Sequence, residues 1–190
     1  MVMANYNARG TMRQRKFKNK ERQSPRLYIN RESHYFEGQR YLLKLNVDPK
    51  NKNSVVLKKT IMQLQLKAEY DTQKRKEILE SWLRAKLRSR LIPFIEKWEN
   101  QLGVKAKECK IKKMKTKWGS CNQEVMRVWF NLELSKVDDY ALDYVVMHEL
   151  AHLKIRNHGK QFIQILNKNM SDWEQRKAQL NETILEFNNA

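Results

Sequence analysis

The chain has 190 residues, of which 41% are hydrophobic, so it is long enough to fold around a sizeable core. Its formal net charge of +18 is extreme for this length, but the hydrophobic content excludes a chain that is disordered throughout. The basic excess lies in residues 1–120, with 31 Lys and Arg against 11 Asp and Glu, whereas residues 121–190 carry 8 against 10.

No secretory signal and no apolar run near the length of a membrane span occur in the sequence, so we expect a cytoplasmic protein. The two cysteines, Cys109 and Cys121, have no histidine or second cysteine at zinc-finger spacing. In a reducing compartment both thiols stay free, and we expect them to be packing residues. A bridge between them is the alternative in an oxidising setting.

Residues 1–25 are polar and basic without apolar periodicity, which predicts a flexible arm or a remnant of a larger segment. Residues 26–190 are expected to form a single domain. Its first part, 26–68, has short aromatic and aliphatic runs that are typical of strands. A break at Glu37-Gly38 indicates two antiparallel strands joined by a turn. This part should therefore be rich in β-strands.

A long amphipathic helix is predicted at 71–102, because apolar residues recur there at steps of three and four. Gly103 is a stop signal for this helix, and Pro93 should kink or split it. The following segment, 107–175, begins with two strand-like runs, "CKIKKMKTKWGSC" and "VMRVWFNLEL".

The helical period then returns. Ser135 or Asp138 can cap a helix that runs into "HELAHL", and Gly159 begins another. A C-terminal helix is predicted at 171–188. The order strands, helix, strands, helices predicts the α+β class.

The stretch "HELAHLKIRNH" contains three of the four histidines in the chain. On a helix, His148 and His152 project from one face about one turn apart and can share a zinc ion. Glu149 lies about 100° around the helix from His148, where its carboxylate can act on water at the metal without being a ligand. This spacing is typical of a metal-activated hydrolase.

A catalytic zinc site normally has three protein ligands, so a further ligand is needed. His158 meets this requirement, because the five residues between it and His152 must leave the helix and turn back. The alternative is three histidines that are solvated or make ordinary hydrogen bonds. Because the helix presents Val145, Val146 and Leu150 as a core side, we predict one zinc ion per chain instead.

The runs "WGSC", "LDYVVMHELAHL" and "NHGKQF", with the upstream "SPRLYINRESHYFEGQRYLL" and "IEKWENQLGV", resemble the YgjP-like metallopeptidase domain, a zincin related in its site to SprT-type proteases. The resemblance covers roughly residues 12–175. It implies a zincin-like α+β fold, in which a small antiparallel sheet is joined by an active-site helix and flanking helices. It also implies a zinc site formed by His148, His152 and His158. Glu149 would be its general base.

Two departures accompany this resemblance. Family members usually have a further β-rich stretch before the region that matches "RQRKFK", so the N-terminal β-rich region looks truncated. The histidine spacing also equals that of metzincins, H-E-x-x-H-x-x-G-x-x-H, but Ile155 stands where their glycine would be. A metzincin is therefore the weaker match.

The implied mechanism is a hydrolysis in which zinc acidifies water and polarises a carbonyl group. Glu149 would take the proton of the water and pass it to the leaving amine. The strand-like run "VMRVWFNLEL" lies just before the active-site helix. We expect it to be an edge strand that binds an extended peptide by strand addition.

Two hypotheses of different classes remain open. The first is a zinc-dependent metallopeptidase that acts on a peptide or protein substrate. The second is a basic nucleic-acid-binding module whose zinc site is structural or vestigial, and a protease that acts on DNA-bound proteins combines the two. Glu149 favours a peptidase, because a structural site needs no carboxylate beside its first ligand and usually has four protein ligands.

The basic excess bears on the second hypothesis. Candidate phosphate contacts along the predicted helix are Arg84, Lys86, Arg88 and Arg90. No base-recognition motif is present, so binding to nucleic acid would be independent of sequence and would weaken steeply with salt. The alternative is a solvated basic surface without a nucleic-acid partner.

Overall fold

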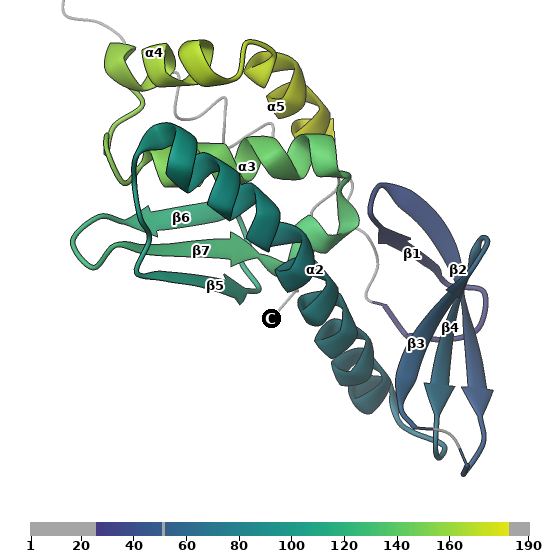
Figure 1. Ribbon diagram of the computed structural model, residues 1–190. Helices are drawn as coiled ribbons and strands as arrows, with labels where there is room; N and C mark the ends of the chain where they lie inside the picture. The colour runs from purple at the N-terminus through teal and green to yellow at the C-terminus, as the bar shows by residue number, and fades with distance from the viewer. Residues whose placement is uncertain (1–25, 51, 183–190) are drawn as a thin grey trace, which may run out of the picture.

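The computed structural model describes residues 26–50 and 52–182, which form an α+β fold (Figure 1). Four strands come first: β1 (Ser33–Phe36), β2 (Gln39–Val47), β3 (Ser54–Lys58) and β4 (Ile61–Leu66). After the long helix α2 (Thr72–Leu102) come β5 (Glu108–Lys112), β6 (Gly119–Asn122) and β7 (Arg127–Asn131). The chain continues with the 3-10 helix η1 (Leu132–Lys136), then α3 (Asp139–Ala151), α4 (Lys160–Asn169) and α5 (Trp173–Glu182). The predicted arm at 1–25 and the last residues of the predicted helix 171–188 lie outside the described residues.

The first four strands form one sheet in the order β1-β2-β4-β3. β1 and β2 are an antiparallel hairpin, and its turn residues Glu37 and Gly38 both have positive φ angles of 51° and 76°, so the predicted turn is confirmed. β3 and β4 form a second hairpin, and β2 pairs with β4 in parallel. The buried side of this sheet packs on Leu79 and Leu83 in the N-terminal half of α2.

Helix α2 connects this sheet to the rest of the molecule (Figure 1). The side chain of Asp71 accepts a hydrogen bond from the Lys74 N–H (2.7 Å) at its start, and Gly103 ends it in the left-handed conformation, as predicted. The helix is continuous through Pro93, so the predicted split is wrong. Four side chains on both sides of Pro93 are buried in the same core, namely Leu87, Leu91, Trp98 and Leu102. Their packing outweighs the one backbone hydrogen bond that proline cannot make.

The second sheet has the order β5-β7-β6 and is mixed, not antiparallel throughout as predicted. β6 and β7 form an antiparallel hairpin, and β7 pairs on its other side with β5 in parallel. β7 is therefore the central strand, and the prediction that it is an edge strand for substrate is wrong. β6 is an outer strand of this sheet, and it contacts α3.

The register of the second sheet also places the two cysteines. Cys109 of β5 and Cys121 of β6 both pair with Val128 of β7, one on each side. Two strand spacings of about 4.8 Å separate their backbones by about 9.6 Å, beyond the limit of about 7 Å between the Cα atoms of a disulfide. Both thiols are free, and a bridge between them is excluded in this fold.

Helix α3 lies between α2, β6 and α5 and fills the centre of the larger core. Of the two predicted caps, Asp138 accepts a hydrogen bond from the Ala141 N–H (2.9 Å). Every residue from 141 to 147 is buried. Gly159 precedes α4, as predicted. The burial of α3 fixes its direction, and with it the side chains at its C-terminal end.

Asp143 links α3 to two neighbouring helices. Its carboxylate accepts hydrogen bonds from Trp98 Nε1 (2.6 Å) and Lys97 Nζ (3.0 Å) of α2 and from Arg176 Nη1 (3.0 Å) of α5. Asp143 is only 5% exposed. A buried carboxylate is tolerated because these donors replace its lost hydration.

Replacing Asp143 with Ala should lower the free energy of unfolding by about 2–3 kcal/mol, because the buried Trp98 N–H loses its acceptor and two cations lose their partner. Urea denaturation followed by circular dichroism measures this change. Glu77→Ala removes an exposed ion pair with Lys74 and serves as the control, with little expected effect. A shift for Asp143→Ala no larger than that of the control would contradict the structural role of Asp143.

Candidate metal centre

Three histidines meet beside the C-terminal end of α3. His148 lies in the last turn of the helix, and His152 directly follows it with backbone angles that are still helical (φ −66°, ψ −16°). The chain then leaves the helix through a turn in which the Leu153 N–H donates to the Leu150 carbonyl (3.0 Å). The loop before α4 returns His158 to the first two. The structure thus brings the three predicted ligands together.

The Nε2 atoms of the three imidazoles converge. Nε2 of His158 lies 3.0 Å from Nε2 of His148 and 3.1 Å from Nε2 of His152. The fully buried ring of Phe162 in α4 packs against all three, with ring centroids at 5.0 Å from His148, 4.6 Å from His152 and 4.8 Å from His158. Phe162 was not assigned a role from the sequence. Its spacing of four residues from His158 was the available signal.

The other ring nitrogens have partners that orient the imidazoles. Nδ1 of His152 donates to the Ile155 carbonyl (3.0 Å), which leaves the lone pair on Nε2. The Tyr144 hydroxyl lies 3.4 Å from Nδ1 of His148, one helical turn earlier. When this nitrogen carries the proton, its N–H donates a hydrogen bond to the hydroxyl oxygen, and His148 also turns its Nε2 lone pair toward the cluster.

The surroundings also keep His148 and His152 neutral. Burial, followed by the charges of His152 and His158, lowers the pKa of His148 to about 3. Burial lowers the pKa of His152 as well. Neutral imidazole is the form that binds a metal ion, so His148 and His152 are in the ligand form at neutral pH.

Glu149 is buried against the backbone of β6. A Cβ atom added at Gly119 would lie 2.5 Å from Cγ and 2.7 Å from Oε1 of Glu149, so any side chain here would force the carboxylate to shift. The backbone of β6 at Gly119 is therefore in close contact with this carboxylate. Burial raises the pKa of Glu149 to about 8, and the positive charge of Lys117 opposes this rise. A cation bound at the histidines would act in the same direction as Lys117 and lower the pKa of Glu149.

The donor set fits zinc. Nitrogens bound at about 2.0–2.1 Å in a tetrahedral site lie about 3.3 Å apart, so the separations of 3.0 and 3.1 Å need only a small adjustment. Within residues 26–50 and 52–182, no cysteine or carboxylate joins the three histidines. Three protein ligands leave a fourth position open, which is typical of catalytic sites and not of structural ones.

Comparison with known families agrees with this geometry. Residues 11–183 match the family described as YgjP-like, metallopeptidase domain. The chain belongs to this family. The match extends over both sheets and α2 as well as the histidine cluster, so the first sheet of the structure is part of the YgjP-like domain.

Solved structures similar to this YgjP-like chain include two metallopeptidase zymogens. Jannalysin of Methanocaldococcus jannaschii is 22% identical with a TM-score of 0.46, over 50% of this chain and 91% of that one. Abylysin of Pyrococcus abyssi is 17% identical with a TM-score of 0.43, over 46% and 89%. No curated protein sequence matches the chain. In the part of the chain that the structure describes, no helix combines the length and the apolar character needed to cross a membrane.

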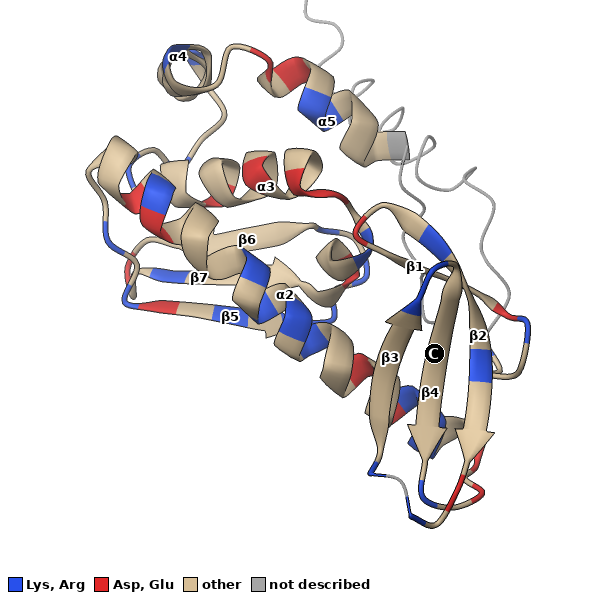
Figure 2. Cartoon of the chain, turned by 45° about the vertical axis from the view of Figure 1, so that its right-hand side comes forward, with Lys and Arg blue, Asp and Glu red and all other residues tan. Residues whose placement is uncertain are grey.

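The four candidate phosphate contacts lie on α2, where Figure 2 shows several Lys and Arg residues. Arg84 donates to the Ile111 carbonyl (2.5 Å), and Arg90 donates to the Val137 carbonyl (2.9 Å) and to Asp139 (2.8 Å). These two guanidinium groups hold α2 to its neighbours. Lys86 and Arg88 are exposed. Nucleic-acid binding through this helix stays a prediction, with two of the four candidates used in the fold.

Purified protein should contain close to one zinc ion per chain by elemental analysis. Changing His148, His152 or His158 to Ala should remove most of it, because each change deletes one of three ligands. His34→Ala is the matched control, since His34 is a buried histidine of the first sheet and bonds to Glu32. Full zinc occupancy after His158→Ala would show that the third ligand is another residue.

Proposed function

We propose that this YgjP-like chain is a zinc-dependent peptidase that hydrolyses peptide bonds. His148, His152 and His158 hold the metal, and Glu149 is the general base. The observation that carries the proposal is the convergence of three imidazole nitrogens at 3.0 and 3.1 Å, with a buried carboxylate next to the first proposed ligand on the same helix.

The chain's own residues supply positioning and proton transfer. A bound zinc ion contributes Lewis-acid chemistry, which acidifies water and polarises a carbonyl group. Glu149 accepts the proton that the attacking water loses and delivers it to the leaving amine. The backbone of β6 at Gly119 holds this carboxylate in place, because it leaves the side chain no room on that side. The general base is thus fixed by packing.

The outer strand β6 is the element best placed to hold a peptide. One of its edges pairs with β7, and its Gly119 adjoins Glu149. An extended peptide that adds to β6 as a further strand would pass the carboxylate and the histidines. Main-chain hydrogen bonds of this kind bind a peptide without selecting its sequence.

A structural zinc site in a nucleic-acid-binding module is the less favoured function. Structural zinc sites usually have four protein ligands, and the described cluster has three. A structural site also gives no reason to bury Glu149 beside a ligand, at the cost of desolvating a carboxylate.

Glu149→Gln should keep the zinc and the fold but reduce hydrolysis at least about a hundredfold, because the amide cannot accept the proton of water. Rates on denatured proteins and on a broad panel of peptides, measured beside zinc content, test this. Equal activity of both forms would exclude Glu149 as the base. Inactivity of both forms on every substrate would remove the main support for a peptidase.

Gly119→Ala should reduce hydrolysis about tenfold or more while the zinc is retained, because the new methyl group displaces the Glu149 carboxylate by several tenths of an ångström. Gly159→Ala adds the same methyl group where no atom lies within 4 Å, and it controls for effects on folding. Unchanged kcat in a zinc-loaded Gly119→Ala protein would show that this contact does not position the base.

A further inference from the structure

An open hollow of about 530 Å³ lies beside the loop that carries His158. One side is formed by Gln123, in the turn that follows β6, and the other by residues 154–157 and by Lys160 at the start of α4. Pockets of about 300–1,000 Å³ are the size that holds a ligand group of a few side chains' volume. This hollow is not used by the metal ligands or by Glu149.

The hollow adjoins the metal centre through shared residues. Ile155 lines it, and the carbonyl of the same residue accepts the hydrogen bond from His152 Nδ1 (3.0 Å). Asn157 also lines it, directly before His158. At its other side, Gln123 directly follows the last residue of β6. A peptide that extends along β6 past Glu149 therefore leads into this hollow.

The hollow is basic. Its lining includes Lys154, Arg156 and Lys160 and no Asp or Glu. Within the described ranges of the chain, none of these three cations forms an ion pair. Basic residues elsewhere do, as in Lys113 with Glu80 and Arg90 with Asp139. The cluster is local, since residues 121–190 carry 8 basic against 10 acidic residues.

We propose that this hollow binds a carboxylate of the peptide substrate, so that the enzyme selects peptides with an acidic group to one side of the cleaved bond. The proposal rests on the peptidase function argued above. Three cations around one hollow attract a carboxylate more strongly than a single surface charge does, because their attractions add. Lys117 near Glu149 extends the same sign of charge to the start of β6.

A carboxylate suits the site better than a nucleic-acid backbone. Single-stranded nucleic acid is bound along grooves of several nucleotides in which aromatic side chains stack on bases. The residues that line this hollow include no aromatic side chain. It therefore lacks the stacking groups that a nucleic-acid groove uses, which favours a carboxylate over a run of phosphates.

The test compares peptides that differ in one carboxylate. A series of fluorogenic peptides with blocked ends carries a single Asp, placed in turn at each of three positions on either side of the cleaved bond. Each peptide has a partner with Asn at the same position. A second pair differs only in a free or amidated C-terminus. At one position, kcat/KM for the acidic member should be about tenfold higher than for the neutral one. An effect in an Asp/Asn pair indicates a side-chain carboxylate, and an effect in the second pair indicates the terminal carboxylate.

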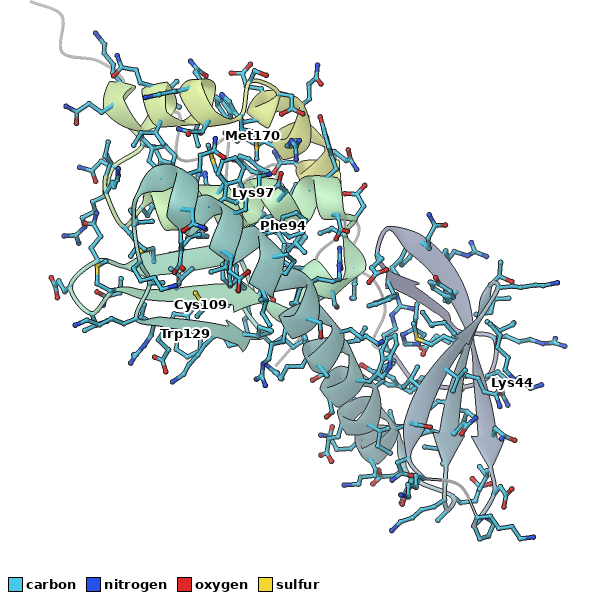
Figure 3. The ribbon with its side chains drawn as sticks, viewed as in Figure 1. Lys44, Phe94, Lys97, Cys109, Trp129 and Met170 are labelled. Atoms are coloured by element: carbon cyan, nitrogen blue, oxygen red, sulfur yellow. The ribbon has the colours of Figure 1, made fainter. Side chains whose placement is uncertain are left out.

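The variant Arg156→Gln with Lys160→Gln should bring this acid-to-neutral ratio close to one. The control, Lys44→Gln with Lys58→Gln, removes the same charge from exposed lysines of the first sheet and should leave the ratio unchanged. Figure 3 shows Lys44 projecting outward from that sheet, at the far end of the molecule from the β6–β7 turn. A ratio near one at every position in the unmodified enzyme, or a ratio that survives the double change, would overturn the proposal.

Failure of the peptidase function is measured separately. If the unmodified protein cleaves no peptide, fluorescence anisotropy measures how tightly the zinc-loaded protein binds the same labelled peptides. This measurement tests the carboxylate site independently of hydrolysis. Tighter binding of the acidic member that is lost with Arg156→Gln and Lys160→Gln supports the carboxylate site. Equal binding of both members overturns it. Loss of oligothymidylate binding in this variant, with an unchanged peptide ratio, would assign the hollow to nucleic acid instead and would also overturn it.

Discussion

Helix α3 is packed on nearly all of its faces, and the geometry of the metal centre follows from this burial. Residues 141–147 are all buried against α2, the second sheet and α5, and the carboxylate of Asp143 joins three helices. Each buried aliphatic side chain contributes about 1.5–3 kcal/mol, so a rotation or shift of the helix would be strongly unfavourable. Metal ligands tolerate displacements of only a few tenths of an ångström. A helix held in this way meets that requirement for His148 and Glu149 without any help from the metal.

His158 depends on a different constraint, because it lies in a loop and is exposed. Its position is set by the turn after α3 and by Phe162, which is anchored in the larger core and contacts the His158 ring edge-on. The loop also lines the basic hollow. A metal ion at the histidines and a group bound in the hollow would therefore both contact this one loop. In the proposed enzyme, His148 and His152 belong to the rigid part of the site, and His158 belongs to the loop that also lines the hollow.

The convergence of the histidines was predictable from the sequence because the relation between the first two is local. A spacing of four residues on a helix fixes the relation of His148 to His152, whatever the rest of the chain does. The strand order was not predictable in the same way. Alternation along the run "VMRVWFNLEL" shows which side chains are buried, but it does not show that both edges of β7 are paired. In the same way, the charge of Arg84 and Arg90 does not show that their partners are backbone carbonyls of distant segments. Nor does the sequence around Gly119 show that this glycine contacts Glu149, which is thirty positions away.

Electrostatics connect the metal to the hollow in the proposed enzyme. Three neutral imidazoles leave the charge of a divalent ion uncompensated, and Lys154, Arg156 and Lys160 add like charge close to one of the ligands. Orientation by Phe162 and by the Ile155 carbonyl must therefore offset a repulsion that a site with carboxylate ligands would not have. A carboxylate bound in the hollow reduces that repulsion. Because linkage is reciprocal, an acidic peptide that binds more tightly to the zinc-loaded protein also raises the affinity for zinc by the same factor. In the proposed enzyme, binding of an acidic substrate and retention of the metal ion are then thermodynamically linked, and this linkage gives a reason for a cationic cluster beside a cation site.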